Sequence, residues 1–456
     1  MKHTLIYTAM IIILITTSCK KGFLEKKPDK AFLVPTTLAD FQAILDNSNE
    51  VFNHTLLLSE LATDDIYITD DGFTYAAPVE QNTYIWAKDL YQGQSQSDWN
   101  KPYQQIFYTN IVLDGLNSNT SLASNSQTYN QIKGTALFAR AFALYNLAQQ
   151  FTVPYQKATA DQQLGLPLRL TSDVQAKSIR STLQQTYDQI NADLQSAINL
   201  LPTQTAYKTR PTKATAYALL ARTALIMQNY PQAEGCAGQS LASENRLLDF
   251  SNLNPDMDYP IPAALSNNNP EVLYYAVQNY SYTFSGSTLT GIDPALYDSY
   301  ADNDLRHDIY FKSTNGIFNF KGSYAGTYEV FGGIATDEVY LILAESQARN
   351  GKTALAMQTL NTLLSKRFKT GQFQNLTASS PEEALAIILK ERRKELVFRN
   401  IRWSDLKRLN LDPKFQKTIT HSVNGINYTL APNSNKYTFP IPNDVIANSG
   451  ITQNER

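Results

Sequence analysis

Cysteine and histidine are scarce in this sequence, which has two Cys and four His in 456 residues. Cys19 closes an N-terminal apolar segment, whereas Cys236 lies in a helical pattern, and this number and placement exclude a disulfide framework. The histidines form no H-x-x-H or H-E-x-x-H pair, which is the spacing that a helical zinc site needs. We therefore expect neither a metal site nor a cofactor.

Charge of one sign is also missing. The formal net charge is −2, and no Lys- or Arg-rich run is present, so nothing in the sequence would follow the phosphates of a nucleic acid. Signatures of catalysis are absent too. There is no G-x-S-x-G, and Gly351-Lys352-Thr353 lacks the first Gly of a phosphate-binding loop because Ser346 stands there. These absences predict a protein that is not an enzyme and binds no nucleic acid.

The N-terminus has the form of a secretory leader. Residues 1–18 hold an apolar run from Leu5 to Ile15, which is too short to span a bilayer, and small residues directly before Cys19. A Cys at this boundary is typical of a lipoprotein, so Cys19 is predicted to become a lipidated N-terminus that holds the protein on a membrane. The polar residues 19–35 are predicted to form a tether.

Apolar residues recur at helical spacing through much of the chain from Trp99 onward. Two segments, one beginning at Tyr217 and one at Tyr340, also match the spacing of a tetratricopeptide repeat. With the other helix pairs they predict a mostly α fold, in which about four helix pairs stack as a scaffold over residues 99–250 and 336–410.

Residues 251–335 lose the helical period and are rich in Asn, Tyr, Gly, Ser and Pro. They predict an inserted, loop-rich subdomain with small strands. A second irregular stretch, residues 59–98, alternates aromatic with acidic residues. Because aromatic rings can stack on the C–H faces of sugars, we expect these stretches to hold the ligand site. The candidates are Tyr67, Phe73, Tyr75, Tyr280, Tyr282, Phe284 and Tyr324.

The stretch that begins at Ser380 has the most specific pattern in the chain. It predicts a single helix, which an S-x-x-E capping box starts and a charged aromatic turn ends. Glu391 and Glu395 are four residues apart and share one helix face, so Arg399 or Arg402 is predicted to pair with one of them.

Within this stretch, ERRKELVFRNIRWSDLKR resembles the signature of the SusD/RagB (starch-utilisation D-like) family, nutrient-uptake lipoproteins of Bacteroidetes. Arg399 stands where the family usually has Glu. The ending from Pro440 to Asn454 and the segment around Asp304 and Arg306 are also similar to the family. The signature residues predicted to lock the helix to its neighbours, and not to touch ligand, are Glu391, Arg392, Glu395, Arg402, Trp403 and Asp405.

The resemblance implies that residues 36–456 form one SusD-like domain. It further implies a non-enzymatic, lipid-anchored protein on the exterior of the outer membrane. Such a protein captures an oligosaccharide, or less often a peptide, and delivers it to a SusC-like TonB-dependent barrel as its partner.

Two other functions stay open. A surface glycosidase would need two carboxylates, which Asp64, Asp65, Asp70 and Asp71 could supply; hydrolysis of glycan would indicate this function. A tetratricopeptide-like assembly factor would instead bind peptide in a concave groove, and would co-purify with a protein while showing no response to glycan.

Overall fold

The computed structural model describes residues 35–48, 50–124, 126–266, 268–284 and 288–456. The described residues form sixteen α-helices and twelve short strands, so the predicted mostly helical fold is confirmed. The predicted leader, Cys19 and residues 19–34 of the predicted tether lie outside the described residues. Among the helices that are described, none is long and apolar enough to cross a membrane.

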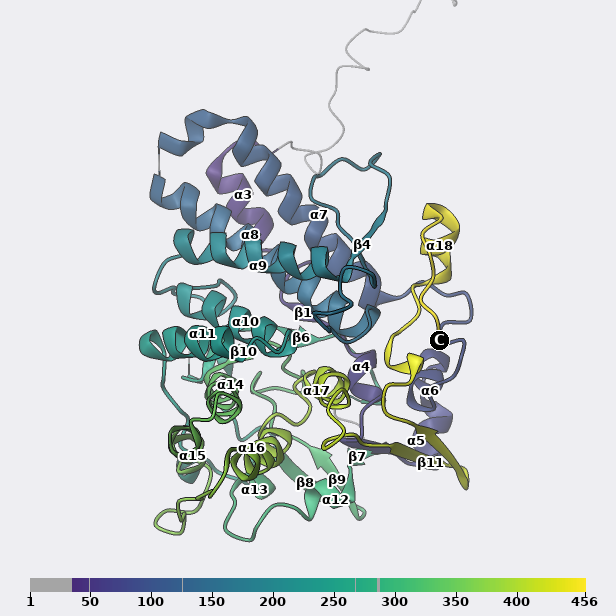
Figure 1. Ribbon diagram of the computed structural model, residues 1–456, viewed down its shortest axis with the longest axis vertical. Helices are drawn as coiled ribbons and strands as arrows, with labels where there is room; N and C mark the ends of the chain where they lie inside the picture. The colour runs from purple at the N-terminus through teal and green to yellow at the C-terminus, as the bar shows by residue number, and fades with distance from the viewer. Residues whose placement is uncertain (1–34, 49, 125, 267, 285–287) are drawn as a thin grey trace, which may run out of the picture.

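Nine of the described helices build the scaffold (Figure 1). Helices α7 to α11 pack one on the next, α11 packs on α14, and α14 contacts both α15 and α16. The chain therefore leaves the scaffold after α11 and returns to its side with α14. The bounds are α7 Ser97–Ser118, α8 Ser126–Phe151, α9 Leu183–Leu200, α10 Lys213–Ile226, α11 Tyr230–Ser243, α14 Thr336–Arg349, α15 Thr353–Leu364, α16 Pro381–Glu395 and α17 Arg402–Leu409.

The two segments with tetratricopeptide spacing form the pairs α10–α11 and α14–α15. Small buried residues on α10, including Ala216, Ala221 and Ala224, let its neighbours approach closely. Each pair is joined by a short turn, and in the second turn Gly351 has φ +78°. That left-handed conformation favours Gly because it has no Cβ.

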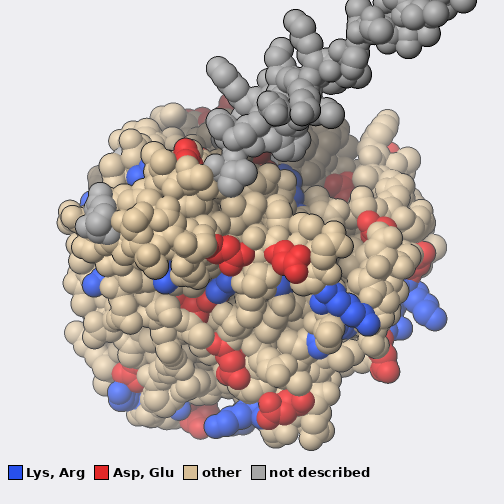
Figure 2. Space-filling model, turned by 90° about the horizontal axis from the view of Figure 1, so that it is seen from above, with Lys and Arg blue, Asp and Glu red and all other residues tan. Residues whose placement is uncertain are grey.

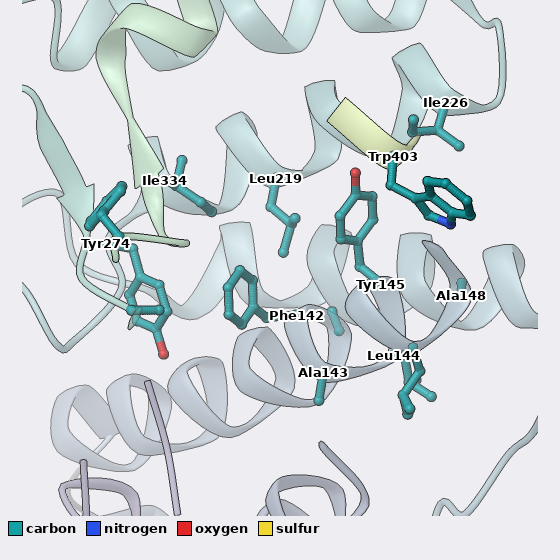
Figure 3. Close-up of a cluster of buried hydrophobic side chains, with 14 of the residues drawn as sticks. Phe142, Ala143, Leu144, Tyr145, Ala148, Leu219, Ile226, Tyr274, Ile334 and Trp403 are labelled. Carbon is teal, nitrogen blue, oxygen red and sulfur yellow. The ribbon is translucent and has the colours of Figure 1, made fainter. Parts of the chain in front are cut away.

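The hydrophobic core joins the scaffold to the rest of the chain. Figure 3 shows Phe142 and Tyr145 of α8 near Leu219 of α10, with Trp403 of α17 close by. The ring of Tyr274 packs edge-on against Phe142, with centroids 5.4 Å apart. Since Tyr274 belongs to a strand of the predicted insertion, the insertion and the longest scaffold helix share one core.

The strands pair two by two, so the described residues contain no large sheet. Strands β1 and β2, from the N-terminal part, pair with β6 and β7 of the predicted insertion, which brings the two irregular stretches together. The pairs are β1 (His54–Thr55) with β6 (Val277–Gln278), β2 (Ile66–Ile68) with β7 (Thr290–Ile292), β3 (Leu164–Pro167) with β4 (Arg180–Thr182), β5 (Val272–Tyr274) with β10 (Ile334–Ala335), β8 (Phe311–Thr314) with β9 (Ile317–Phe320), and β11 (Ile419–Val423) with β12 (Ile426–Leu430).

Residues 59–98 are more regular than predicted, because short helices occupy much of this stretch. In α5 the Thr69 hydroxyl accepts the N–H of Gly72 at 3.0 Å, and α6 begins with a Pro. Such short helices carry too few residues to show a hydrophobic period. The short helices of the chain are α3 Leu38–Leu45, α4 Leu58–Leu61, α5 Asp70–Tyr75, α6 Pro78–Tyr84, α12 Pro294–Tyr297, α13 Arg306–Tyr310 and α18 Asn443–Ser449.

The stretch predicted as a single helix from Ser380 is two helices, α16 and α17. Phe398 and Asn400 between them have φ +56° and +58°, and these left-handed residues break the helical path. The Ser380 hydroxyl accepts the N–H of Glu383 at 3.2 Å, as an N-cap does. The Glu383 carboxylate, however, accepts hydrogen bonds from Ser379 and not from Ser380.

Candidate ligand-binding surface

Three of the predicted aromatic residues lie open to solvent. Tyr75 ends α5 and is 74% exposed, while Tyr280 and Tyr282 follow β6 and are 65% and 76% exposed. Aromatic side chains ordinarily bury most of their area. Three open rings therefore supply apolar faces, each with a hydroxyl group, on which a ligand can stack.

Backbone pairing brings α5 next to the loop that carries Tyr280 and Tyr282. The N–H of Thr69 donates to the carbonyl of Leu289 at 3.0 Å, which extends the pairing of β2 with β7. A Cβ added at Gly72 would lie 2.8 Å from the Leu289 oxygen, so α5 and this loop are in direct contact. The close approach requires Gly at this position.

Two more tyrosines lie on this part of the molecule and were not among the predicted candidates. Tyr328 is 55% exposed, and its ring stands edge-on to Tyr280 with centroids 6.4 Å apart. Tyr259, which is partly exposed, lines the same shallow pocket as Tyr328. We call Tyr75, Tyr259, Tyr280, Tyr282 and Tyr328 the tyrosine surface. The only sign in the sequence was that Tyr328 shares a Gly-flanked loop with Tyr324.

Two predicted candidates are buried, and the prediction that they face ligand is wrong for this structure. Tyr324 is 1% exposed, and its hydroxyl donates to the Glu271 carboxylate at 2.7 Å. Phe284 is 8% exposed and packs edge-on against Phe398, with centroids 5.3 Å apart. Although both residues lie in loops, burying their rings against the core stabilises the protein more than leaving them exposed to a ligand would.

Tyr67, on β2, and Phe73, on α5, are half-buried. Tyr67 lies on β2 over Gly291, where an added Cβ would come within 2.8 Å of its ring. Phe73 lies 6.3 Å from Tyr84, measured between ring centroids. These contacts leave each ring only partly available to a ligand.

The signature residues of α16 lie in a buried network of ion pairs. Arg306 is fully buried and contacts Asp304 at 2.6 Å, Glu391 at 2.6 Å and Glu395 at 3.1 Å. Glu395 also accepts from Arg367 at 2.7 Å. Lys394 of α16 also pairs with Glu391, at 2.9 Å. Arg306, Arg367 and Lys394 together thus neutralise the glutamates on this face of α16.

The predicted partners of these glutamates were therefore wrong. Arg399 instead pairs with Asp337 at 2.9 Å, and its guanidinium lies over the ring of Tyr324, 4.4 Å from the centroid. Local spacing favoured a pairing within the motif, but the left-handed turn after α16 directs Arg399 away from that helix face.

A second cluster joins α16, α17 and α14. Asp405 accepts from Arg392 and from Arg408, each at 2.8 Å, and Arg408 also reaches Glu345 at 2.6 Å. Burial alone would raise the pKa of Asp405, but the two arginines hold it at about 2. The indole N–H of Trp403 donates to a backbone carbonyl at 3.2 Å.

Asp64 and Asp65, which could have served a glycosidase, are occupied by ion pairs. Asp64 accepts from Arg402 at 2.7 Å and from Lys417 at 2.6 Å, and Asp65 accepts from Arg393 at 2.7 Å. Burial would raise the pKa of Asp64, yet the cations around it hold that pKa well below its usual range.

Asp70 and Asp71 are exposed in the first turn of α5. A glycosidase needs one carboxyl group shielded enough to keep its proton and a second one across the substrate. Burial raises the pKa of Asp65, but this residue is 1% exposed and paired with Arg393, so a substrate cannot reach it. Within the described ranges, no group of three or more His, Cys, Asp or Glu side chains could hold a metal ion.

A cavity of about 670 Å³ lies elsewhere, between residues 153–164, the end of α17 and the C-terminal tail. Amide and hydroxyl side chains form much of its lining. Lys407 contributes to it and donates to two backbone carbonyls at 2.6 Å, and burial lowers the pKa of this lysine to about 7. The cavity is polar and lacks the open aromatic faces of the tyrosine surface.

Charged groups do not form an extended field of one sign on the face seen from above in Figure 2. Blue and red groups are interspersed there among uncharged residues. A ligand that meets this face would find little long-range electrostatic steering.

Comparison with known proteins gives matches at both ends of the chain. Residues 22–225 match the family model described as "Starch-binding associating with outer membrane", and residues 336–456 match the model described as "SusD family". The chain is also similar to SusD-like protein P2 of Formosa agariphila, with 24% identity over 98% of this chain and 99% of that protein.

Solved structures share the fold. A SusD superfamily protein of Bacteroides thetaiotaomicron superposes with a TM-score of 0.74 and 22% identity, over 92% of this chain and 100% of its own. A SusD-like carbohydrate binding protein of Bacteroides vulgatus gives 0.68 and 19%, over 91% and 97%. At these identities the likeness establishes the arrangement of helices and strands.

Proposed function

This chain belongs to the SusD family, and from that membership we propose that it captures an oligosaccharide at the tyrosine surface and passes it to a TonB-dependent outer-membrane transporter. Proteins of the family bind carbohydrate in nutrient capture and associate with the outer membrane. The oligosaccharide, its site and the transporter are our proposal for this chain.

The observation that carries the proposal is the group of open tyrosine rings. Tyr75, Tyr280 and Tyr282 are each more than half exposed, and they come from two segments that pack together. An aromatic face stacks on the C–H face of a sugar, while the phenol hydroxyl can hydrogen-bond to sugar hydroxyls. Binding without hydrolysis is favoured because Asp64 and Asp65 are held in buried ion pairs, whereas Asp70 and Asp71 are exposed side by side on α5.

The same proposal gives the N-terminal part its role. A lipid on Cys19 would hold the protein at the outer membrane on its exterior side, and residues 19–35 would let the helical body move over the transporter. A single acyl chain binds a membrane only weakly, so several acyl chains or contact with the barrel would be needed for stable residence.

Binding measurements test the site directly. We expect calorimetric titration of residues 20–456 with a panel of plant, host and fungal oligosaccharides to identify a ligand. Replacing Tyr75, Tyr280 and Tyr282 together by Ala should then weaken its binding at least about tenfold, since each aromatic contact contributes about 0.5–1.5 kcal/mol. Tyr207→Ala, at an exposed tyrosine outside this surface, is the matched control.

The result also separates the alternatives. Unchanged affinity of the triple variant would exclude the tyrosine surface as the site. Products released from the glycan would indicate a glycosidase, and a response to peptides alone would indicate a peptide-binding member of the family.

A further inference from the structure

A second cavity, of about 320 Å³, opens between α12, α16 and α17. It is apart from the tyrosine surface, since none of the five tyrosines lines it. Four cationic side chains contribute to its lining, and apolar side chains fill much of the remainder. The cations are Lys390, Arg393, Arg402 and Lys417, and the apolar residues include Leu296, Leu389, Leu406 and Phe415.

Positive charge exceeds negative charge around this cavity. Asp64 and Asp65 face Arg402, Lys417 and Arg393, as described above. The third acid is Asp293, whose carboxylate is partly exposed and lies 3.6 Å from Arg393. Lys390 is exposed, and within the described part of the chain no ion pair to it is recorded. The described lining of the cavity therefore holds four cations and no carboxylate, and three aspartates lie within 4 Å of these cations.

Arg393 and Arg402 each have one nitrogen, Nη1, that is available to donate a hydrogen bond to a ligand. Arg393 uses Nε and Nη2 toward Asp65 and Asp64, and Arg402 uses Nε and Nη2 toward Asp64. Among the described residues, neither Nη1 has a hydrogen-bond partner. The side chains of Arg393 and Arg402 remain 17% and 12% exposed, so a ligand can reach them.

We propose that this cavity binds an anionic group, the carboxylate or sulfate ester of a monosaccharide-sized acid. Guanidinium groups are well suited to both oxyanions because their planar N–H donors match the oxygen spacing. The ion pairs with Asp64 and Asp65 hold both guanidiniums in place before ligand arrives, which lowers the entropic cost of binding. The apolar side of the ligand would rest on Leu296 and Phe415.

The site takes its anion independently of what the tyrosine surface binds. Its volume is at the lower end of the range of about 300–1,000 Å³ that ligand pockets span, which favours a single ring over a chain. Lys390 and Lys417 lie at the exposed side, where they would attract the anion, whereas the arginines would set its orientation.

Titration at low ionic strength tests the proposal, because exposed charges are screened by salt. Residues 20–456 would be titrated with glucuronic acid, with glucose 6-sulfate and with glucose. We expect at least one acid to bind measurably and glucose to bind far more weakly. The two acids distinguish a carboxylate site from a sulfate site.

Lys390→Glu should lower the affinity for the acid by about five- to tenfold, which corresponds to the loss and reversal of one exposed charge contact. Lys417→Gln should lower the affinity for the acid less, because the ion pair between Asp64 and Arg402 remains and still orients the Arg402 guanidinium. Lys133→Glu is the matched control with the same change of charge, on α8, at the other end of the scaffold from α16 in Figure 1.

Crystals soaked in selenate would locate the anion by its anomalous signal, expected beside Arg393 and Arg402. The proposal is overturned if glucose binds as well as both acids, if Lys390→Glu and Lys133→Glu behave alike, or if selenate binds only elsewhere. None of these outcomes would alter the binding of a neutral oligosaccharide at the tyrosine surface, so the two proposals fail separately.

Discussion

A carboxyl group that keeps its proton lies beneath the ion pairs of Asp64 and Asp65. Glu60 is 1% exposed, and one of its oxygens accepts the N–H of Asn400 at 2.6 Å. Burial is the larger cause and repulsion from Asp65 the smaller one, and together they raise the pKa of Glu60 to about 8. At neutral pH this residue is therefore uncharged, and it adds no third negative charge to the buried aspartates.

Replacing Glu60 by Gln should make stability less dependent on pH. The native protein keeps this proton to about pH 8, whereas the unfolded chain releases it near pH 4.5. The contribution of Glu60 to the free energy of unfolding is thus full below pH 4.5 and falls as pH rises to about 8. The slope approaches about 1.4 kcal/mol per pH unit.

Relative to the wild type, Glu60→Gln should gain stability between about pH 5 and about pH 8. Urea denaturation at both ends of this window measures the difference. Glu382→Gln makes the same change at an exposed glutamate of α16 and is the matched control. If the wild type and Glu60→Gln differ by the same amount at both pH values, then Glu60 does not titrate in this window.

Some single residues could not be placed correctly from the sequence, because their partners lie far away in the chain. Tyr324 and Tyr328 share one loop, and only tertiary contacts separate them, since Tyr324 meets Glu271 and Tyr328 meets Tyr280. Arg399 likewise finds its partner 62 positions away, at Asp337. Local spacing carries no information about such contacts. The exposure of Tyr75, by contrast, was predictable, because the acidic residues near it in the sequence indicate a segment on the surface.

At the scale of elements, the turn between α14 and α15 depends on one glycine. Gly351 has φ +78°, and an added Cβ would meet no atom within 4 Å. Gly351→Ala should therefore destabilise the protein by about 1–2 kcal/mol through backbone strain alone, because the left-handed region is unfavourable for residues with a Cβ. Thermal or urea denaturation measures this loss.

Gly235 provides the matched control for that substitution. It lies inside α11, where an added Cβ also meets nothing within 4 Å, and its φ is helical. Gly235→Ala should leave stability unchanged or raise it by up to about 1 kcal/mol, since Ala has the higher helix propensity. If both variants lose the same stability, strain at Gly351 is not the cause.

Elements with a clear period were predicted well, and short elements were not. The helix pairs α10–α11 and α14–α15 lie where repeat spacing placed them, because small and large apolar residues recur three and four positions apart along whole helices. The N-cap at Ser380 was predicted from three residues. Helices as short as α5 and the two-residue strands depend on contacts with distant parts of the chain, as β1 does on β6. No local sequence pattern predicts such elements.

At the scale of the whole molecule, the buried ion pairs connect parts that the chain order separates. Arg306 and Arg367 tie the region between α11 and α16 to α16. Arg402 ties α17 to the N-terminal Asp64, and Arg408 ties α17 to α14. The tyrosine surface is built on segments that meet through this network, so its geometry depends on ion pairs that lie outside the surface itself.

Arg306→Met removes the central cation of this network. Lys394 and Arg367 then remain as the only cations paired with Asp304, Glu391 and Glu395 among the described residues. Breaking a buried ion pair from one side typically costs about 3–5 kcal/mol, and we expect a loss of at least about 3 kcal/mol. Arg246→Met, at an exposed pair with Glu244, should cost less than about 1 kcal/mol. Denaturation followed by far-UV circular dichroism and by Trp fluorescence measures the loss of stability in both variants.

Because the network links the scaffold to the insertion, the two signals should shift together. Separate transitions in Arg306→Met would instead show that the scaffold unfolds independently of the insertion.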